Sequence, residues 1–152
     1  MILVDANLLL YASYTDFTQH GVARRWLEER LNGRSRVGLP WPSLVAFLRV
    51  ATNRRVFREP ALLRDAWRLV ETWLDRDVAW IPSPTDRHRE VLSDLLSAPG
   101  VEGNLVHDAH LAALAIEHGL ELCSADGDFA RFPGLRWSNP LAAAAGSSGL
   151  GR

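Results

Sequence analysis

The first apolar run of the chain is short and unbroken. Ile2, Leu3 and Val4 stand in a row, whereas a strand exposed on one side would alternate apolar with polar residues. We therefore predict a strand that is buried on both faces and central in its sheet. Asp5 follows this strand at once, and Asn7 precedes an apolar run with helical spacing. Asp5 thus lies where open α/β sheets place their functional sites, or it simply caps the helix.

Helical periodicity recurs at five further places along the chain. The predicted helices span residues 18–31, 44–52, 60–74, 86–96 and 104–118. Residues 40–43, which include two prolines, are predicted to form a loop that leads into the second of these helices. Short apolar runs form strand candidates at residues 36–39, 78–81, 120–123 and 135–137.

Strands that alternate with one or two helices predict a mainly parallel sheet covered on both faces. The fold class is therefore α/β, and we expect a three-layer α/β/α sandwich whose central sheet has four to five short strands. The 152-residue length fits a single domain, which we assign to residues 1–140. Residues 141–152 are rich in Ala, Gly and Ser and are predicted to form a mobile tail.

The composition limits which ligands the protein can bind and in which cellular compartment it can reside. Seventeen basic residues against eighteen acidic ones leave a net charge of −1, so any nucleic acid must bind to a local basic patch. No stretch approaches the roughly 20 apolar residues of a membrane span, and Asp5 interrupts the first apolar run, unlike a signal peptide. The single cysteine, Cys123, excludes an internal disulfide and fits a reducing cytoplasm.

The chain contains no lysine, and all seventeen basic residues are arginines. This excludes a phosphate-binding loop with its lysine, a Schiff-base enzyme and any mechanism built on a lysine base. Arginine remains available for phosphate contacts, because its planar guanidinium group binds two oxygens at once.

Four aspartates are predicted to meet at one edge of the sheet. Asp5 follows the first strand, and Asp126 and Asp128 follow the strand at 120–123. Asp108 lies in the first or second turn of the preceding helix. Carboxylates gathered in this way repel one another unless a cation neutralises them, and oxygen ligands suit Mg²⁺ or Mn²⁺ better than Zn²⁺. The alternative is a favourable charge near a helix N-terminus at Asp108 and an ordinary turn at 126–128.

Three motifs stand in a characteristic order, at residues 4–7, 103–115 and 124–129. Together they resemble the motifs of PIN-domain ribonucleases, most closely the VapC toxins of bacterial toxin–antitoxin (VapBC) pairs. The resemblance covers residues 1–140. It implies a metal-dependent endoribonuclease that hydrolyses RNA phosphodiester bonds with Mg²⁺ or Mn²⁺ and inhibits translation and growth. It also implies a homodimer and a VapB-type antitoxin whose C-terminal segment covers the acidic site.

The resemblance also assigns roles to individual residues. The implied catalytic residues are Asp5, Asp108, Asp126 and Asp128. The first three of these are the implied metal ligands, with Asn7, Asn104 and Ser124 as supporting residues. The candidates for RNA phosphate contacts are Arg49, Arg54, Arg55 and Arg58, and His107 and His110 are weaker candidates at the rim of the site. A solvated surface is the alternative interpretation of the arginine cluster.

One position departs from the family pattern. Many PIN domains carry a glutamate where this chain has Ala46, so a second metal site is in question. A PIN domain that binds RNA or an antitoxin without efficient cleavage is therefore the main alternative function. A phosphatase of the haloacid dehalogenase type fits poorly, because it requires an aspartate at position 7 and a lysine. Zinc at His107 and His110 also fits poorly, because no third histidine or cysteine has the expected spacing.

Overall fold

The computed structural model describes residues 1–142 and contains a five-stranded parallel sheet in the order β3-β2-β1-β4-β5. The strands are β1 (Ile2–Val4), β2 (Val37–Gly38), β3 (Ala79–Trp80), β4 (Glu121–Cys123) and β5 (Trp137–Ser138). Strand β1 lies at the centre, as its unbroken apolar sequence predicts. The α/β class and the parallel sheet are confirmed, whereas the predicted tail at 141–152 lies outside the described residues except for its first two.

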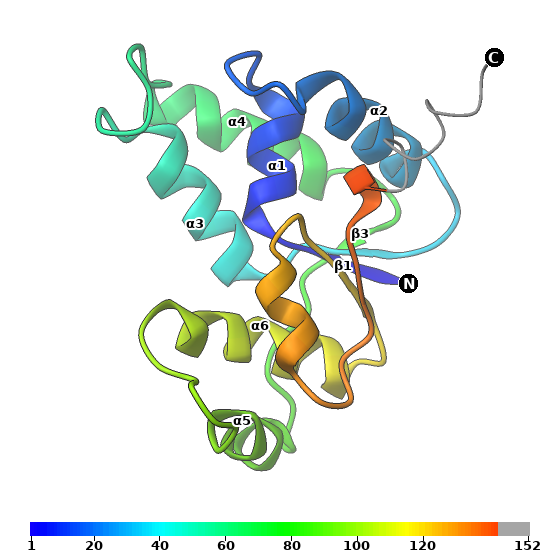
Figure 1. The fold of residues 1–152 in the computed structure, drawn as a ribbon. Coiled ribbons are helices and arrows are strands. Elements are labelled where there is room, and N and C mark those ends of the chain that lie inside the picture. The colour runs from blue at the N-terminus through cyan, green and yellow to red at the C-terminus, as the bar shows by residue number, and fades with distance from the viewer. Residues whose placement is uncertain (143–152) are drawn as a thin grey trace, which may run out of the picture.

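Helices cover both faces of the sheet. They are α1 (Ala6–Ser13), α2 (His20–Leu31), α3 (Trp41–Ala51), α4 (Leu63–Leu74), α5 (His88–Leu96) and α6 (Asn104–Glu117), and a 3₁₀ helix, η1, spans Gly127–Arg131. Figure 1 shows α1 to α4 on one side of the strands and α5 and α6 on the other. No helix within residues 1–142 is both long and apolar enough to cross a membrane.

Strands β1 and β4 divide their side chains between two hydrophobic cores. Val4 and Cys123 belong to the core formed with α1 to α4, whereas Leu3 and Leu122 belong to the core formed with α5 and α6. This division follows from the alternation of side chains along a strand. All four residues are buried, so the predicted burial of the first strand on both faces is confirmed.

The predicted loop at residues 40–43 is wrong, because α3 already begins at Trp41. Pro42 lies in the first turn of this helix, where its missing N–H is not needed for a helical hydrogen bond. The next helix begins at Leu63 rather than at residue 60. The N–H of Ala61 donates to the carbonyl of Ala51, which ties the preceding segment back to the end of α3. The last strand lies at 137–138 rather than 135–137.

Candidate functional site

Asp5 stands at the carboxyl end of β1 and uses both of its carboxylate oxygens. Oδ1 accepts a hydrogen bond from the N–H of Ala6 at 2.7 Å, so Asp5 does cap α1. Oδ2 accepts one from the hydroxyl of Ser124 at 2.8 Å. Burial raises the pKa of Asp5 above its usual range, although the bonds from Ser124 and Ala6 act in the opposite direction. The capping role and a role in the site are therefore compatible.

Ser124 joins the ends of β1 and β4. Its fully buried hydroxyl accepts hydrogen bonds from Nδ2 of Asn7 and from the N–H of Asp126, each at 3.0 Å. Oδ1 of Asn7 in turn accepts from the N–H of Ala125 at 3.3 Å. The predicted supporting residues Asn7 and Ser124 thus form one network with Asp5 and fix the loop that carries Asp126.

Three carboxylates converge beside this network. Oxygen atoms of Asp108, Asp126 and Asp128 all lie within 4.8 Å of one another. Asp126 is held by an N–H of Asp128, which donates to its Oδ1 at 2.9 Å. The ordinary turn at 126–128, which was the alternative interpretation of this sequence, is therefore present. The same turn places the carboxylates of Asp126 and Asp128 near Asp108. We call Asp108, Asp126 and Asp128 the acidic trio.

Asp5 lies outside the acidic trio, although the family resemblance implies that it is a metal ligand together with Asp108 and Asp126. Its charge nevertheless raises the pKa of Asp108, so the two carboxylates interact. The structure therefore brings all four predicted acids to the carboxyl edge of the sheet. Asp128, and not Asp5, is the third carboxylate that lies close to Asp108 and Asp126. The predicted set of metal ligands did not include Asp128.

The acidic trio is electrostatically strained. Burial, followed by the charges of Asp126, Asp5 and Asp128, raises the pKa of Asp108 to about 6. Arg131 lowers this pKa and donates from Nη2 to Oδ1 of Asp128 at 3.3 Å. Arg131 was not among the predicted site residues. Its position three residues after Asp128 is a weak signal, because residues three apart meet only on a helical turn, and no helix was predicted at Gly127–Arg131.

The donor atoms of this site fit a hard divalent cation. All are carboxylate oxygens, the ligands that Mg²⁺ and Mn²⁺ prefer, and one arginine does not balance four acids. A cation would also remove the repulsion that raises the pKa of Asp108. The residues present therefore fit a hard divalent cation such as Mg²⁺ or Mn²⁺, which the acidic trio would hold with Asp5 alongside.

A hollow of about 630 Å³ opens next to Asp108, between α3 and α6. Its lining residues are Pro42, Val45, Ala46, Arg49, Asn104, His107 and Asp108. The predicted RNA contact Arg49, the predicted supporting residue Asn104 and the rim candidate His107 are thus brought to the site. Ala46 also lines the hollow and supplies no carboxylate to it.

The other candidates for RNA contacts lie apart from this hollow. Arg54, Arg55 and Arg58 are exposed and make no ion pair with another described residue. His110 does not line the hollow but contacts His88. Only Arg49 and His107 of the predicted RNA contacts therefore lie beside the acids.

Comparison with known proteins agrees with this architecture. The model of the PIN domain family matches residues 2–135. Ribonuclease VapC37 of Mycobacterium tuberculosis is 45% identical over 142 residues, which cover 93% of this chain and 99% of that protein. Ribonuclease VapC43 of the same species is 43% identical over 141 residues, with 93% and 96% covered.

Solved structures share the fold at lower sequence identity. VapC20 of Mycobacterium tuberculosis, described as a Sarcin-Ricin loop cleaving toxin, superposes with a TM-score of 0.65 at 21% identity, covering 90% of this chain and 99% of that chain. A chain of VapBC2 from Rickettsia felis, bound to a promoter DNA fragment, superposes with a TM-score of 0.66 at 19% identity. The match covers 91% of this chain and 98% of that chain. The chain therefore belongs to the PIN-domain family, within its VapC branch.

Proposed function

We propose that this chain is a Mg²⁺- or Mn²⁺-dependent endoribonuclease, the toxin of a VapBC toxin–antitoxin pair. The observation that carries the proposal is the acidic trio next to Asp5 at the carboxyl edge of a PIN-domain sheet. Relatives that are 42–45% identical along nearly their whole length bear the name VapC ribonuclease, which supports the same reaction class. Growth inhibition by RNA cleavage in the cytoplasm follows from this proposal.

The residues of the site have different roles in the proposed phosphodiester hydrolysis. Asp108, Asp126 and Asp128 would hold the cation, with Asp5 fixed beside them by Ser124. A cation bound there would supply Lewis-acid chemistry, which polarises a phosphate oxygen and lowers the pKa of a bound water. Asn7 and Ser124 keep the loop that carries Asp126 in place, so the carboxylates do not have to rearrange during the reaction.

The hollow beside Asp108 is the proposed place for the RNA backbone. Arg49 and His107 line it and can donate hydrogen bonds to phosphate oxygens. Asn104 lines the same hollow and offers an amide that can donate and accept. Arg54, Arg55 and Arg58 would contact phosphates of the RNA further from the scissile bond.

We further propose a homodimer and a VapB-type antitoxin as protein partners. Large apolar side chains at this end of the molecule are exposed, with 43% for Trp41, 55% for Val45 and 47% for Val106. Exposed apolar side chains grouped near a site support burial by another protein surface. The Rickettsia felis neighbour, a VapBC2 structure, supports an antitoxin as one such partner.

Cleavage of a panel of structured and single-stranded RNAs by antitoxin-free protein tests the proposal. We expect cutting in Mg²⁺ or Mn²⁺, none in EDTA, and a loss of at least about 10²-fold in Asp108→Asn and Asp126→Asn. Asp94→Asn is the matched control, because Asp94 is exposed on α5. Cutting that persists in EDTA, or in both site variants, would contradict the metal mechanism.

Ala46 motivates a second candidate function, a PIN domain that binds RNA without efficient cleavage. It lines the hollow beside Asp108 and leaves that side of the site without a carboxylate. RNA binding without cutting of any RNA in the panel would favour this alternative. In that case Ala46→Glu is the informative variant, since a gain of cleavage would identify the missing carboxylate as the cause.

A further inference from the structure

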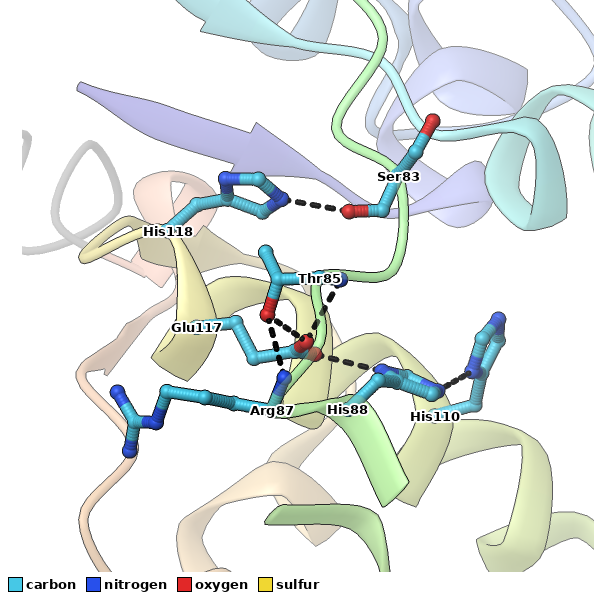
Figure 2. A network of polar contacts seen from close by, with 7 residues as sticks. All are labelled: Ser83, Thr85, Arg87, His88, His110, Glu117 and His118. Atoms are coloured by element: carbon cyan, nitrogen blue, oxygen red, sulfur yellow. Dashed lines mark hydrogen bonds and ion pairs between the residues drawn. The ribbon is translucent and has the colours of Figure 1, made fainter. Parts of the chain in front are cut away.

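Two histidines from neighbouring helices contact each other and are not part of the acidic trio. Nε2 of His88 lies 3.0 Å from Nδ1 of His110, and the two rings are perpendicular with centroids 4.9 Å apart. His88 begins α5 and His110 lies within α6. Figure 2 shows both rings at the end of a chain of polar contacts that starts at Glu117. No step of the proposed RNA hydrolysis uses this pair.

A covered carboxylate fixes the orientation of His88. The side chain of Glu117 is 0% exposed and lies 2.6 Å from Nδ1 of His88. Its other oxygen accepts from the hydroxyl and the N–H of Thr85, at 2.7 and 3.0 Å (Figure 2). With a proton on Nδ1, the neutral ring of His88 presents the lone pair of Nε2 toward His110. A carboxylate behind a histidine is the usual outer arrangement of metal-binding histidines.

The spacing of the two nitrogens suits a shared metal ion. At metal–nitrogen bonds of about 2.0–2.1 Å, nitrogens 3.0 Å apart subtend an angle of about 95° at the ion. Neighbouring ligands in square-planar and octahedral complexes, which Cu²⁺ and Ni²⁺ adopt, lie close to this angle. The side chain of His88 is 15% exposed, so water can reach the ion and complete its ligand shell. Without a metal this contact is a hydrogen bond between the two rings. Binding therefore requires that the proton on Nδ1 of His110 leaves or moves to its Nε2, and that the His110 ring rotates until its Nδ1 lone pair faces the ion.

We propose that His88 and His110 form a second metal site, which binds a late first-row divalent ion through nitrogen, with Glu117 as the outer carboxylate. Imidazole is a good ligand for Cu²⁺, Ni²⁺ and Zn²⁺ and a poor one for Mg²⁺, so this site and the acidic trio select different ions. Cu²⁺ binds the most tightly of these ions. An ion bound here links α5 to α6 and stabilises the folded chain, because the unfolded chain does not hold the two rings together.

Titration of the tag-free full chain with Ni²⁺ and Cu²⁺ tests this site, with Mg²⁺ in excess to occupy the acidic trio. We expect one tightly bound ion per chain and a Cu²⁺ electron paramagnetic resonance spectrum with two imidazole nitrogens. His110→Gln leaves the contact between His88 and Glu117 in place, and it should weaken binding by at least roughly tenfold and remove one nitrogen from the spectrum. Glu117→Gln should weaken binding by about 10- to 100-fold while both nitrogens remain.

Two matched variants locate the ion. His20→Gln changes a histidine that begins α2 and whose Nδ1 contacts the carbonyl of Tyr11. His118→Gln changes one whose Nε2 contacts the carbonyl of Ser83. Both should bind Ni²⁺ and Cu²⁺ as the unaltered chain does. Unchanged affinity in His110→Gln, or loss of binding in His118→Gln, would overturn the proposal. The measurement uses no RNA, so its outcome is independent of the nuclease activity.

Discussion

Asp108 is the residue whose charge destabilises the folded chain most clearly. Its pKa is about 6 in the folded state, against about 3.9 for an unperturbed aspartate, so the folded chain binds this proton more tightly than the unfolded chain. The cost of the charge is therefore largest above pH 6 and disappears below about pH 4. Because Asp108 is only half-buried, solvent screening reduces the apparent cost to about 1–2 kcal/mol.

Asp108→Asn should therefore stabilise the metal-free protein. We expect the free energy of unfolding in EDTA to rise by about 1–2 kcal/mol at pH 7 and to be unchanged at pH 4. Saturating Mg²⁺ should reverse the order, since the unaltered chain gains more from the ion. Urea unfolding at pH 4 to 7 measures this, with Asp94→Asn as the control. A gain of the same size at pH 4 and pH 7 would show that charge repulsion is not the cause.

Single acids could be predicted from sequence, but their hydrogen-bond partners could not. Asp5 and Asp126 each follow a recognisable strand, and the carboxyl ends of parallel strands share one edge of the sheet. The contact between Asp5 and Ser124 instead joins positions 119 residues apart. Such a contact depends on which strands are neighbours, and no local periodicity carries that information.

At the scale of elements, Glu117 joins α6 to the segment before α5. Its side chain is covered and contacts both Thr85 and His88. Burial alone raises its pKa, but the hydrogen bonds from His88 and Thr85 outweigh burial and lower the pKa below its usual value. The charged form of Glu117 therefore stabilises the fold. This stabilisation is complete at pH values above the unfolded pKa of about 4.3, and it is lost as the pH falls through the lower pKa of the folded state.

Glu117→Ala should destabilise the chain more than any exposed acid on the same helices. It leaves His88 and the N–H of Thr85 without their acceptor in a covered position, which costs about 2–4 kcal/mol. The difference from the unaltered chain should be constant from pH 6 to 7 and should shrink below about pH 4. Glu90→Ala, on the exposed side of α5, is the control. An effect of Glu117→Ala no larger than that of Glu90→Ala would rule out the proposed link.

Element boundaries were harder to predict than the elements themselves. The strands are two or three residues long, which is too short for an alternation of apolar and polar residues to mark where each strand begins and ends. The start of α3 was missed because the two prolines at 40 and 42 indicate a loop by composition. Proline is equally suited to the first turn of a helix, and only the surrounding packing decides between the two.

At the scale of the whole molecule, charge limits how RNA can bind. The net charge is −1, so the molecule as a whole does not attract RNA and a local patch must supply the affinity. Arg54, Arg55 and Arg58 follow the end of α3 and are exposed without a described acidic partner. Each phosphate that such a residue neutralises releases condensed counterions, which makes binding depend on salt.

Replacing these three arginines with glutamine should weaken RNA binding and flatten its salt dependence. In an Asp126→Asn background, which prevents cleavage, the slope of log K against log salt should fall in magnitude by about 2, since each contact contributes about 0.7 on single-stranded RNA. The thermal stability should be unchanged, because the three side chains are exposed. The control replaces Arg34, Arg87 and Arg89, which are equally exposed and lie on other segments. If both sets lower the slope equally, RNA binds without a preferred surface, whereas a change confined to the first set places the strand along the end of α3.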